Sequence, residues 1–214
     1  MLIKKIFKKF YKFYKSFKAV LFHDFLKLYP HYDNIDEFLS NIDLGKTSFS
    51  SSLDIGCGRK IKNPFLAKQI CGVDLIDFDN VVKCDVIANK LPFDDNKFDC
   101  CTAFDFLEHV PRVSIKNGKT YFPFIELIDD VYRILKPHGL FLHVTPAYPS
   151  KFAFQDPTHV NIITENTFPK YFCSDKKIGK EPKANMYGFK GNFSLLRQGW
   201  LKDHWVISLL KVEK

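Results

Sequence analysis

Three features of membrane and secreted proteins are missing from this sequence. The 214 residues contain no apolar run near the ~18–20 residues that a membrane span needs. Lysines interrupt the first apolar positions every two or three residues, which argues against a secretory signal. The six cysteines form no CxxC pair and no zinc-ligand spacing, and several stand in apolar runs, where a free cysteine behaves as a small hydrophobe. We therefore expect a cytoplasmic protein with reduced thiols.

Acidic residues are absent from residues 1–20, which contain seven lysines. The net charge of the chain is +8, and without these lysines 25 basic residues face 24 acidic ones. The positive charge therefore belongs to an N-terminal arm, and the body is nearly neutral. We predict an arm over residues 1–30 and one domain over 31–214, because 46% hydrophobic residues in this length can form a single sizeable core.

The arm has the periodicity of an amphipathic helix. At ~100° per residue its apolar side chains fall within about 140°, with the lysines opposite. These apolar residues are Leu2, Ile3, Ile6, Phe7, Phe10, Phe13, Tyr14, Phe17, Val20 and Leu21. Three roles fit such a helix: a lid on the domain, a nucleic-acid contact, or an interfacial helix on an anionic membrane. The separated faces and aromatic content favour the membrane, which would place the protein on the inner face as a peripheral protein.

Short, nearly continuous apolar runs follow from residue 50 onward. Five of them read as strands: SSLDI, QICGVDL, NVVKCDV, FDCCTAF and GLFLHVTP. Helical spacing over 124–135 predicts a helix before the fifth run, ended by Pro137 and Gly139. The pattern indicates an α/β fold, Rossmann-like and doubly wound, with a mostly parallel seven-stranded sheet. We expect a core over 50–146, a substrate-side insertion over about 147–192, and an antiparallel closing hairpin over about 193–214.

The loop after the first strand, DIGCGRK, brings Gly56 and Gly58 where a ligand or a tight turn would need them. A third glycine is missing, because Ile61 stands there, and this argues against a dinucleotide site. Asp74 ends the second strand, where an acid can bind ribose hydroxyls. Asp85 ends the third strand, where an acid can accept a hydrogen bond from an adenine amine. The two glycines could instead form a plain turn, and Asp85 could be a solvated strand end.

These pieces, followed by LPFDDNKFD, LEH and LKPHG, resemble class I S-adenosylmethionine-dependent methyltransferases with LDxGCG, LPFxDxxFD, LEH and LKPGG signatures. The resemblance covers roughly residues 50–146 and implies S-adenosyl-L-methionine as cofactor. It also implies that Asp54, Gly56 and Gly58 line the methionine portion of the cofactor and that Asp74 binds its ribose. Asp85 and Val86 would contact the adenine, and Phe104 and Asp105 would lie beneath the sulfonium. Lys60 departs from the pattern, and residues 59–69 are too few for a full helix.

A hydroxyl acceptor would need a base, most often a histidine. The candidates near the same sheet edge are His109, His143, Asp156 and His159, each of which could instead be structural. Asp156 and His159, three residues apart, form the favoured acceptor-side pair. No third ligand accompanies them, so we predict no metal.

The acceptor is the least determined part of the prediction. The segment FQDPTHVNIITENTFPKYF is similar to one in methyltransferases of glycan pathways, which favours O-methylation of a glycan, glycolipid or small molecule. The motifs of amino-directed DNA methyltransferases and of cytosine C5 enzymes are both absent after the fourth strand. These absences argue against nucleic acid, while a protein acceptor and an inactive, membrane-associated binding module stay open. The sequence does not indicate an oligomeric state.

Overall fold

The computed structural model describes residues 29–45, 48–174 and 179–214. The chain divides into two units, Met1–Pro30 and His31–Lys214, and the account below concerns the second. The predicted amphipathic helix lies outside the described residues, so its role stays a prediction. Within the described ranges, no helix combines the length and the apolar character needed to cross a membrane. The six cysteines are free thiols, as their spacing predicts.

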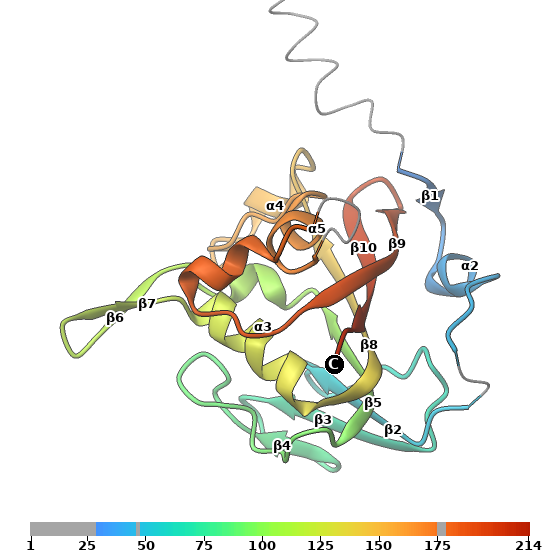
Figure 1. Ribbon diagram of the computed structural model, residues 1–214, viewed down its shortest axis with the longest axis horizontal. Helices are drawn as coiled ribbons and strands as arrows, with labels where there is room; N and C mark the ends of the chain where they lie inside the picture. The colour runs from blue at the N-terminus through green and yellow to red at the C-terminus, as the bar shows by residue number, and fades with distance from the viewer. Residues whose placement is uncertain (1–28, 46–47, 175–178) are drawn as a thin grey trace, which may run out of the picture. The chain divides into compact units, whose positions relative to one another are not determined.

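An eight-stranded sheet organises the unit (Figure 1). From one edge to the other its strands are β1 (His31–Tyr32), β9 (Phe193–Leu201), β10 (Trp205–Val212), β8 (Leu135–Pro146), β5 (Phe98–Phe104), β2 (Ser51–Ile55), β3 (Gln69–Asp74) and β4 (Val81–Lys83). Neighbours from β8 to β4 pair in parallel, and β10 pairs antiparallel with both β8 and β9. The predicted fold class and the closing hairpin are confirmed, and the short β1, parallel to β9, is an addition.

Side chains alternate between two hydrophobic clusters, one on each face of the sheet. In β5, Cys101 and Ala103 join one cluster, while Cys100 and Phe104 join the other. All seven residues of β5 are buried, because successive side chains of a strand point to opposite faces and both faces are covered. The continuous apolar run in the sequence reflects this double burial.

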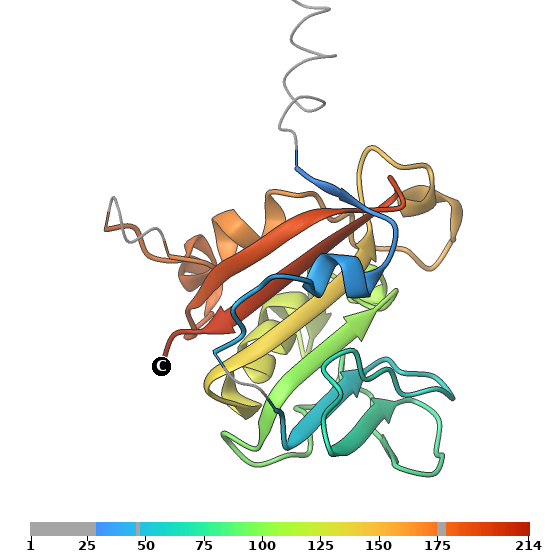
Figure 2. The ribbon, with the colours of Figure 1, turned by 90° about the vertical axis from the view of Figure 1, so that its right-hand side faces the viewer.

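One long helix covers the first face. Helix α3 (Pro123–Ile134) buries Leu127, Ile128, Val131 and Ile134 against the sheet, as the helical spacing predicts. It ends at Ile134, and β8 begins at the next residue, so Pro137 and Gly139 lie within that strand and do not end the helix. The opposite face carries α2 (Ile35–Leu39), whose Phe38 is fully buried (Figure 2).

The connections between the first strands differ from a doubly wound pattern. Residues 56–68, 75–80 and 84–97 contain no helix, because they are short and two of them carry a proline, Pro64 or Pro92. Loops cover this part of the sheet instead. The remaining elements are the hairpin β6 (Ser114–Lys116) and β7 (Lys119–Tyr121), the 3-10 helices η1 (Leu107–His109) and η2 (Lys183–Tyr187), and the short helices α4 (Phe152–Gln155) and α5 (Thr167–Tyr171).

Candidate active site

The glycine loop follows β2, and its two glycines serve different ends. Gly56 has a φ of +65°, and a Cβ built there would lie 2.2 Å from the ring of Phe106. The close approach at Gly56 is therefore explained by a neighbouring side chain. Gly58 also has a positive φ, +56°, but beyond its two chain neighbours no atom of the described residues lies within 4 Å of a Cβ built there. Gly58 is the position at which the loop leaves room for a ligand.

Two carboxylates hold this loop in place. Asp54 is 1% exposed, and it accepts hydrogen bonds from Thr102 Oγ1 at 2.6 Å and from the Lys62 amide at 2.8 Å. Burial raises the pKa of Asp54 to about 6. Asp74, at the end of β3, accepts from the Gly58 amide through Oδ2 at 2.8 Å. Among the described residues, its Oδ1 accepts a single long hydrogen bond of 3.4 Å, from the Ile76 amide, so this oxygen retains capacity for a ligand hydroxyl.

Asp85 lies beside Asp74 at the same edge of the sheet, since the Cys84 amide donates to the Asp74 carbonyl at 2.8 Å. The Asp85 carboxylate accepts from the amides of Ile87 and Ala88, so it shapes the turn that follows β4. Val86 is half-buried. Asp54, Gly58, Asp74 and Asp85 are thus brought to one edge, where three parallel strands end.

Phe104 and Asp105, the two residues predicted to lie beneath the sulfonium, have different surroundings at the end of β5. Phe104 is buried in the cluster that contains Phe38, and the Lys62 ammonium lies 4.6 Å from its ring centroid. Asp105, with a φ of +49°, accepts from Trp205 Nε1 at 2.7 Å. Phe106 is the side chain that contacts the glycine loop, and sequence reasoning missed it.

A cluster of ionisable side chains follows directly, in η1 and in the loop after α4. The Glu108 carbonyl accepts from the amides of Val160 and Asn161, which ties this loop to η1. His159 Nε2 lies 3.9 Å from Glu108 Oε1 and 4.0 Å from Asp156 Oδ2. The structure therefore brings the favoured pair Asp156 and His159 together with a third candidate, His109, and adds Glu108.

The two carboxyl groups beside His159 are in opposite protonation states. Glu108 is 1% exposed, and neither of its oxygens has a hydrogen-bond partner among the described residues. Burial raises its pKa to about 8, so the group is mostly neutral at neutral pH. Hydrogen bonds from Thr158 lower the pKa of Asp156, which stays ionised. Divergent carboxyl pKa values are typical of acid–base sites.

His109 completes the cluster. Its ring meets that of His159 edge to face, with the centroids 4.8 Å apart, and its Nδ1 lies 3.0 Å from Thr158 Oγ1. Glu108, His109 and His159 each place a ligating atom within 4.8 Å of the other two, so this trio could hold a divalent cation. Sequence spacing missed this third ligand, because Glu108 precedes His159 by some fifty residues.

His143 does not belong to this cluster. It is fully buried on β8, with its ring centroid 3.9 Å from that of Phe168. Burial lowers its pKa to about 3, so the ring is neutral. We therefore assign His143 to the core.

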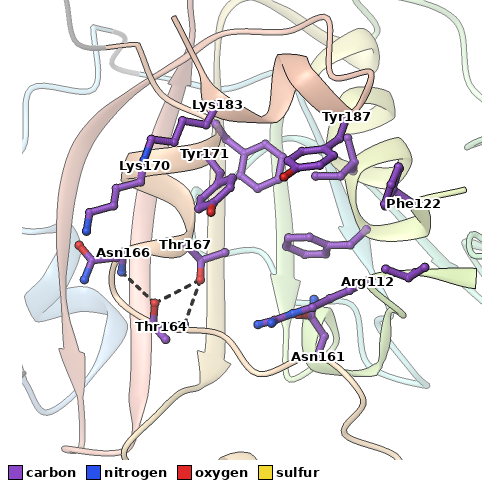
Figure 3. Close-up of a pocket in the computed structure, with 14 residues that line it drawn as sticks. Arg112, Phe122, Asn161, Thr164, Asn166, Thr167, Lys170, Tyr171, Lys183 and Tyr187 are labelled. Atoms are coloured by element: carbon purple, nitrogen blue, oxygen red, sulfur yellow. Dashed lines mark hydrogen bonds between the residues drawn. The ribbon is translucent and has the colours of Figure 1, made fainter. Parts of the chain in front are cut away.

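A cavity of about 660 Å³ lies on the side of the domain that carries α5 and η2 (Figure 3). Residues from the loop after η1, the start of α3, α5 and η2 line it. Asn161 belongs to both regions: it lines the cavity, and its backbone amide donates to Glu108. The cavity is large enough for a small-molecule or monosaccharide-sized ligand.

Comparison with known proteins identifies the fold and the chemistry. A family model described as a methyltransferase domain matches residues 25–174. The 24-methylenesterol C-methyltransferase 2 of Arabidopsis thaliana is 28% identical over 83 residues, which are 37% of this chain and 20% of that protein. The chain thus spans about a fifth of the length of this curated relative.

Solved structures of similar fold include two described as SAM-dependent methyltransferases. The one from Archaeoglobus fulgidus is 20% identical, with a TM-score of 0.45, and the alignment covers 76% of this chain and 86% of that one. The one from Aquifex aeolicus is 14% identical, with a TM-score of 0.47, and the alignment covers 76% and 82%.

Proposed function

The chain belongs to the S-adenosylmethionine-dependent methyltransferases, and from this premise we propose that it methylates a hydroxyl group of a glycan, glycolipid or small-molecule acceptor. The observation that carries the proposal is the environment of His159. An ionised Asp156 and a neutral Glu108 flank this ring, and Asn161, two residues further along the chain, lines a cavity. A hydroxyl acceptor needs a base so placed.

The residues at the glycine loop fit the cofactor. The open space at Gly58 lets the backbone approach a ligand, and Asp74 Oδ1 is available to a ribose hydroxyl. Asp85 and Val86 would lie against the adenine, and Asp54, Phe104 and Asp105 would surround the methionine and sulfonium end. When bound, S-adenosylmethionine supplies an activated methyl group, so the protein's main tasks are alignment and proton removal.

We assign proton removal to His159. Its imidazole would accept the acceptor's hydroxyl proton, and the Asp156 carboxylate, 4.0 Å away, would stabilise the resulting imidazolium. Glu108 fills the buried side of the ring without adding a second negative charge at neutral pH. His109, edge-on to His159 and bonded to Thr158, restricts the ring's position.

Substitutions test these roles. We expect His159→Ala to lower turnover by about 10²–10⁴-fold with S-adenosylmethionine affinity nearly unchanged. Glu108→Gln, which keeps the shape of a neutral carboxyl, should retain most activity, and Asp156→Asn should not. His138→Asn, at an exposed position of β8 with a φ of +62°, is the control histidine substitution. Wild-type turnover in a folded His159→Ala protein would remove the proposed base.

Two further measurements separate the alternatives. Isothermal titration with S-adenosylmethionine tests the reading of an inactive binding module, since a domain without cofactor affinity cannot transfer a methyl group. Chelator treatment tests the reading of a cation held by Glu108, His109 and His159. We expect activity to survive chelation, and its loss together with recovery on adding Zn²⁺ or Mg²⁺ would reassign the cluster to metal binding.

A screen of glycan, small-molecule and protein acceptors with a labelled methyl donor would identify the substrate.

A further inference from the structure

The charged side chains that line the cavity at Asn161 are basic. Arg112, Lys170 and Lys183 line it, and no aspartate or glutamate does so among the residues that the structure describes. Within the part of the chain that the structure describes, the Arg112 guanidinium donates to two neutral oxygens, those of the Asn161 side chain and the Ile162 carbonyl. No carboxylate in the described ranges forms an ion pair with any of these three cations. Their combined charge is thus available to a ligand.

Aromatic rings form the walls between these cations. Phe122 and Tyr187 pack edge to face with their centroids 5.4 Å apart, and the Lys183 ammonium lies 5.8 Å from the Tyr171 ring centroid (Figure 3). Tyr171 and Tyr187 are 40% and 45% exposed, although large aromatic side chains are usually covered. Exposed aromatic faces next to cations suit a ligand that combines a ring with a negative group.

Hydrogen-bonding side chains complete the lining. Thr164, Asn166 and Thr167 lie on one wall, joined by hydrogen bonds that include the Thr164 amide to Thr167 Oγ1 at 3.0 Å (Figure 3). A cavity with aromatic walls and a few polar groups is the usual form of a small-ligand site, in which the polar groups orient the ligand.

The cavity is physically connected to the proposed base. Asn161 accepts from Arg112 at 2.6 Å, donates through its side chain to the Leu107 carbonyl, and donates through its amide to the Glu108 carbonyl. His159 precedes Asn161 by two residues. Arg112 is therefore linked through Asn161 to the backbone of η1, the element that carries Glu108 and His109.

We propose that this cavity binds the methyl acceptor and that the acceptor is an anionic ring compound, such as a sugar that carries a phosphate or carboxylate group. The proposal rests on the proposed function in one respect, the identification of the bound ligand as the acceptor. The negative group would pair with Arg112, Lys170 and Lys183, and the ring would lie against Tyr171 and Tyr187. Bidentate pairing with a planar guanidinium suits either kind of anion.

Binding to the full-length protein tests the proposal directly. We expect glucose 6-phosphate and glucuronate to bind at least tenfold more tightly than glucose in isothermal titration, and salt to weaken both. The Lys170→Met/Lys183→Met double variant should lose about tenfold or more of the affinity for both anions. Lys180→Met, an exposed lysine in the same segment that does not line the cavity, is the matched control. Arg112→Lys tests the guanidinium separately.

The outcomes separate this proposal from the methyltransferase assignment. Unchanged anion affinity in the double variant would show that the anions bind elsewhere, for example at the lysines of residues 1–20, and would overturn the proposal. Equal affinity for glucose and its anionic counterparts would overturn it as well. S-adenosylmethionine affinity, measured on the same proteins, shows whether the variants are folded and tests the cofactor assignment independently.

Discussion

At the scale of single residues, Asp54 links stability to pH. Its pKa is about 6 in the folded protein and 3.8 without its surroundings, so the folded state binds the proton more tightly. Asp54 therefore contributes stability fully below pH 3.8, and this contribution is lost as the pH rises to about 6. The loss is on the order of 2–3 kcal/mol.

Asp54→Asn should remove this dependence, because a neutral amide can still accept from the Lys62 amide and can donate to Thr102 Oγ1. Denaturant unfolding between pH 4.5 and 7.5 should show a flatter stability profile for the variant than for the wild type. Asp79→Asn, an exposed residue, serves as control. Parallel profiles for wild type and Asp54→Asn would contradict the prediction.

Asp74 is expected to contribute to cofactor affinity. Asp74→Ala should weaken S-adenosylmethionine binding several-fold to about a hundredfold, as expected for the loss of a hydrogen bond to a charged group, roughly 1.5–3 kcal/mol. Asp74→Asn should cost less, because an amide oxygen can still accept from the Gly58 amide. Isothermal titration measures both, with the exposed Asp77→Ala as control. An unchanged affinity in folded Asp74→Ala would remove Asp74 from the site.

The sequence predicts the site residues that directly follow strands. It does not reveal those whose role depends on packing against segments far away in the chain. Asp74 and Asp85 are found because carboxyl ends of parallel strands meet at one edge. Phe106 and Glu108 were missed as site residues because their roles depend on contacts with Gly56 and with the loop at His159, far away in sequence. The LEH motif itself gives no sign that its glutamate is buried without a hydrogen-bond partner among the described residues.

At the scale of elements, α3 fixes the loop that joins β4 to β5. Arg133 donates to the Leu91 and Phe93 carbonyls at 2.9 and 2.7 Å, and to the buried Asp130 at 2.6 Å. Asp130 in turn accepts from the Leu91 amide. Asp130 and Arg133, one turn apart on α3, thus form hydrogen bonds with backbone groups of a segment that contains no helix.

Arg133→Met should lower the free energy of unfolding by about 2–4 kcal/mol, because it leaves Asp130 buried without its cation and removes the guanidinium donor from the Phe93 carbonyl. Asp95→Asn is the matched control, since this 68% exposed partner of the same guanidinium should contribute less than about 1 kcal/mol. Chemical denaturation at neutral pH compares them. Equal losses for the two variants would mean that the exposed ion pair carries the effect.

Helices and strands were predictable where the same spacing of apolar residues extended over many positions. The α3 spacing and the β5 run are such cases, and both were predicted correctly. The two-residue β1 was not predictable, because its pairing with Trp200 and Leu201 depends on residues far along the chain. Similarly, Leu135 fits the helical spacing, yet it begins β8.

At the scale of the whole molecule, charge is divided between the lysine-rich residues 1–20 and a nearly neutral body. We expect the full-length protein to co-sediment with anionic vesicles and much less with neutral ones, since each lysine near an anionic surface contributes about 1 kcal/mol. Removal of residues 1–20 should abolish sedimentation and spare S-adenosylmethionine binding. Indifference of the full-length protein to anionic vesicles, or unfolding of the truncated one, would favour a helix packed on the domain.

The contact between Gly56 and Phe106 also bears on how relatives of this protein can diverge. A side chain at Gly56 meets two separate obstacles, a positive φ and the Phe106 ring, so no single compensating substitution elsewhere can make it acceptable. Lineages that abandon methyl transfer should therefore keep Gly56 for folding alone, while Gly58 meets only the cost of its positive φ of +56°, which asparagine tolerates better than most residues. In a family tree, a glycine-to-asparagine change at Gly58 should thus be more frequent than any change at Gly56, and the persistence of Gly56 should carry no information on catalysis.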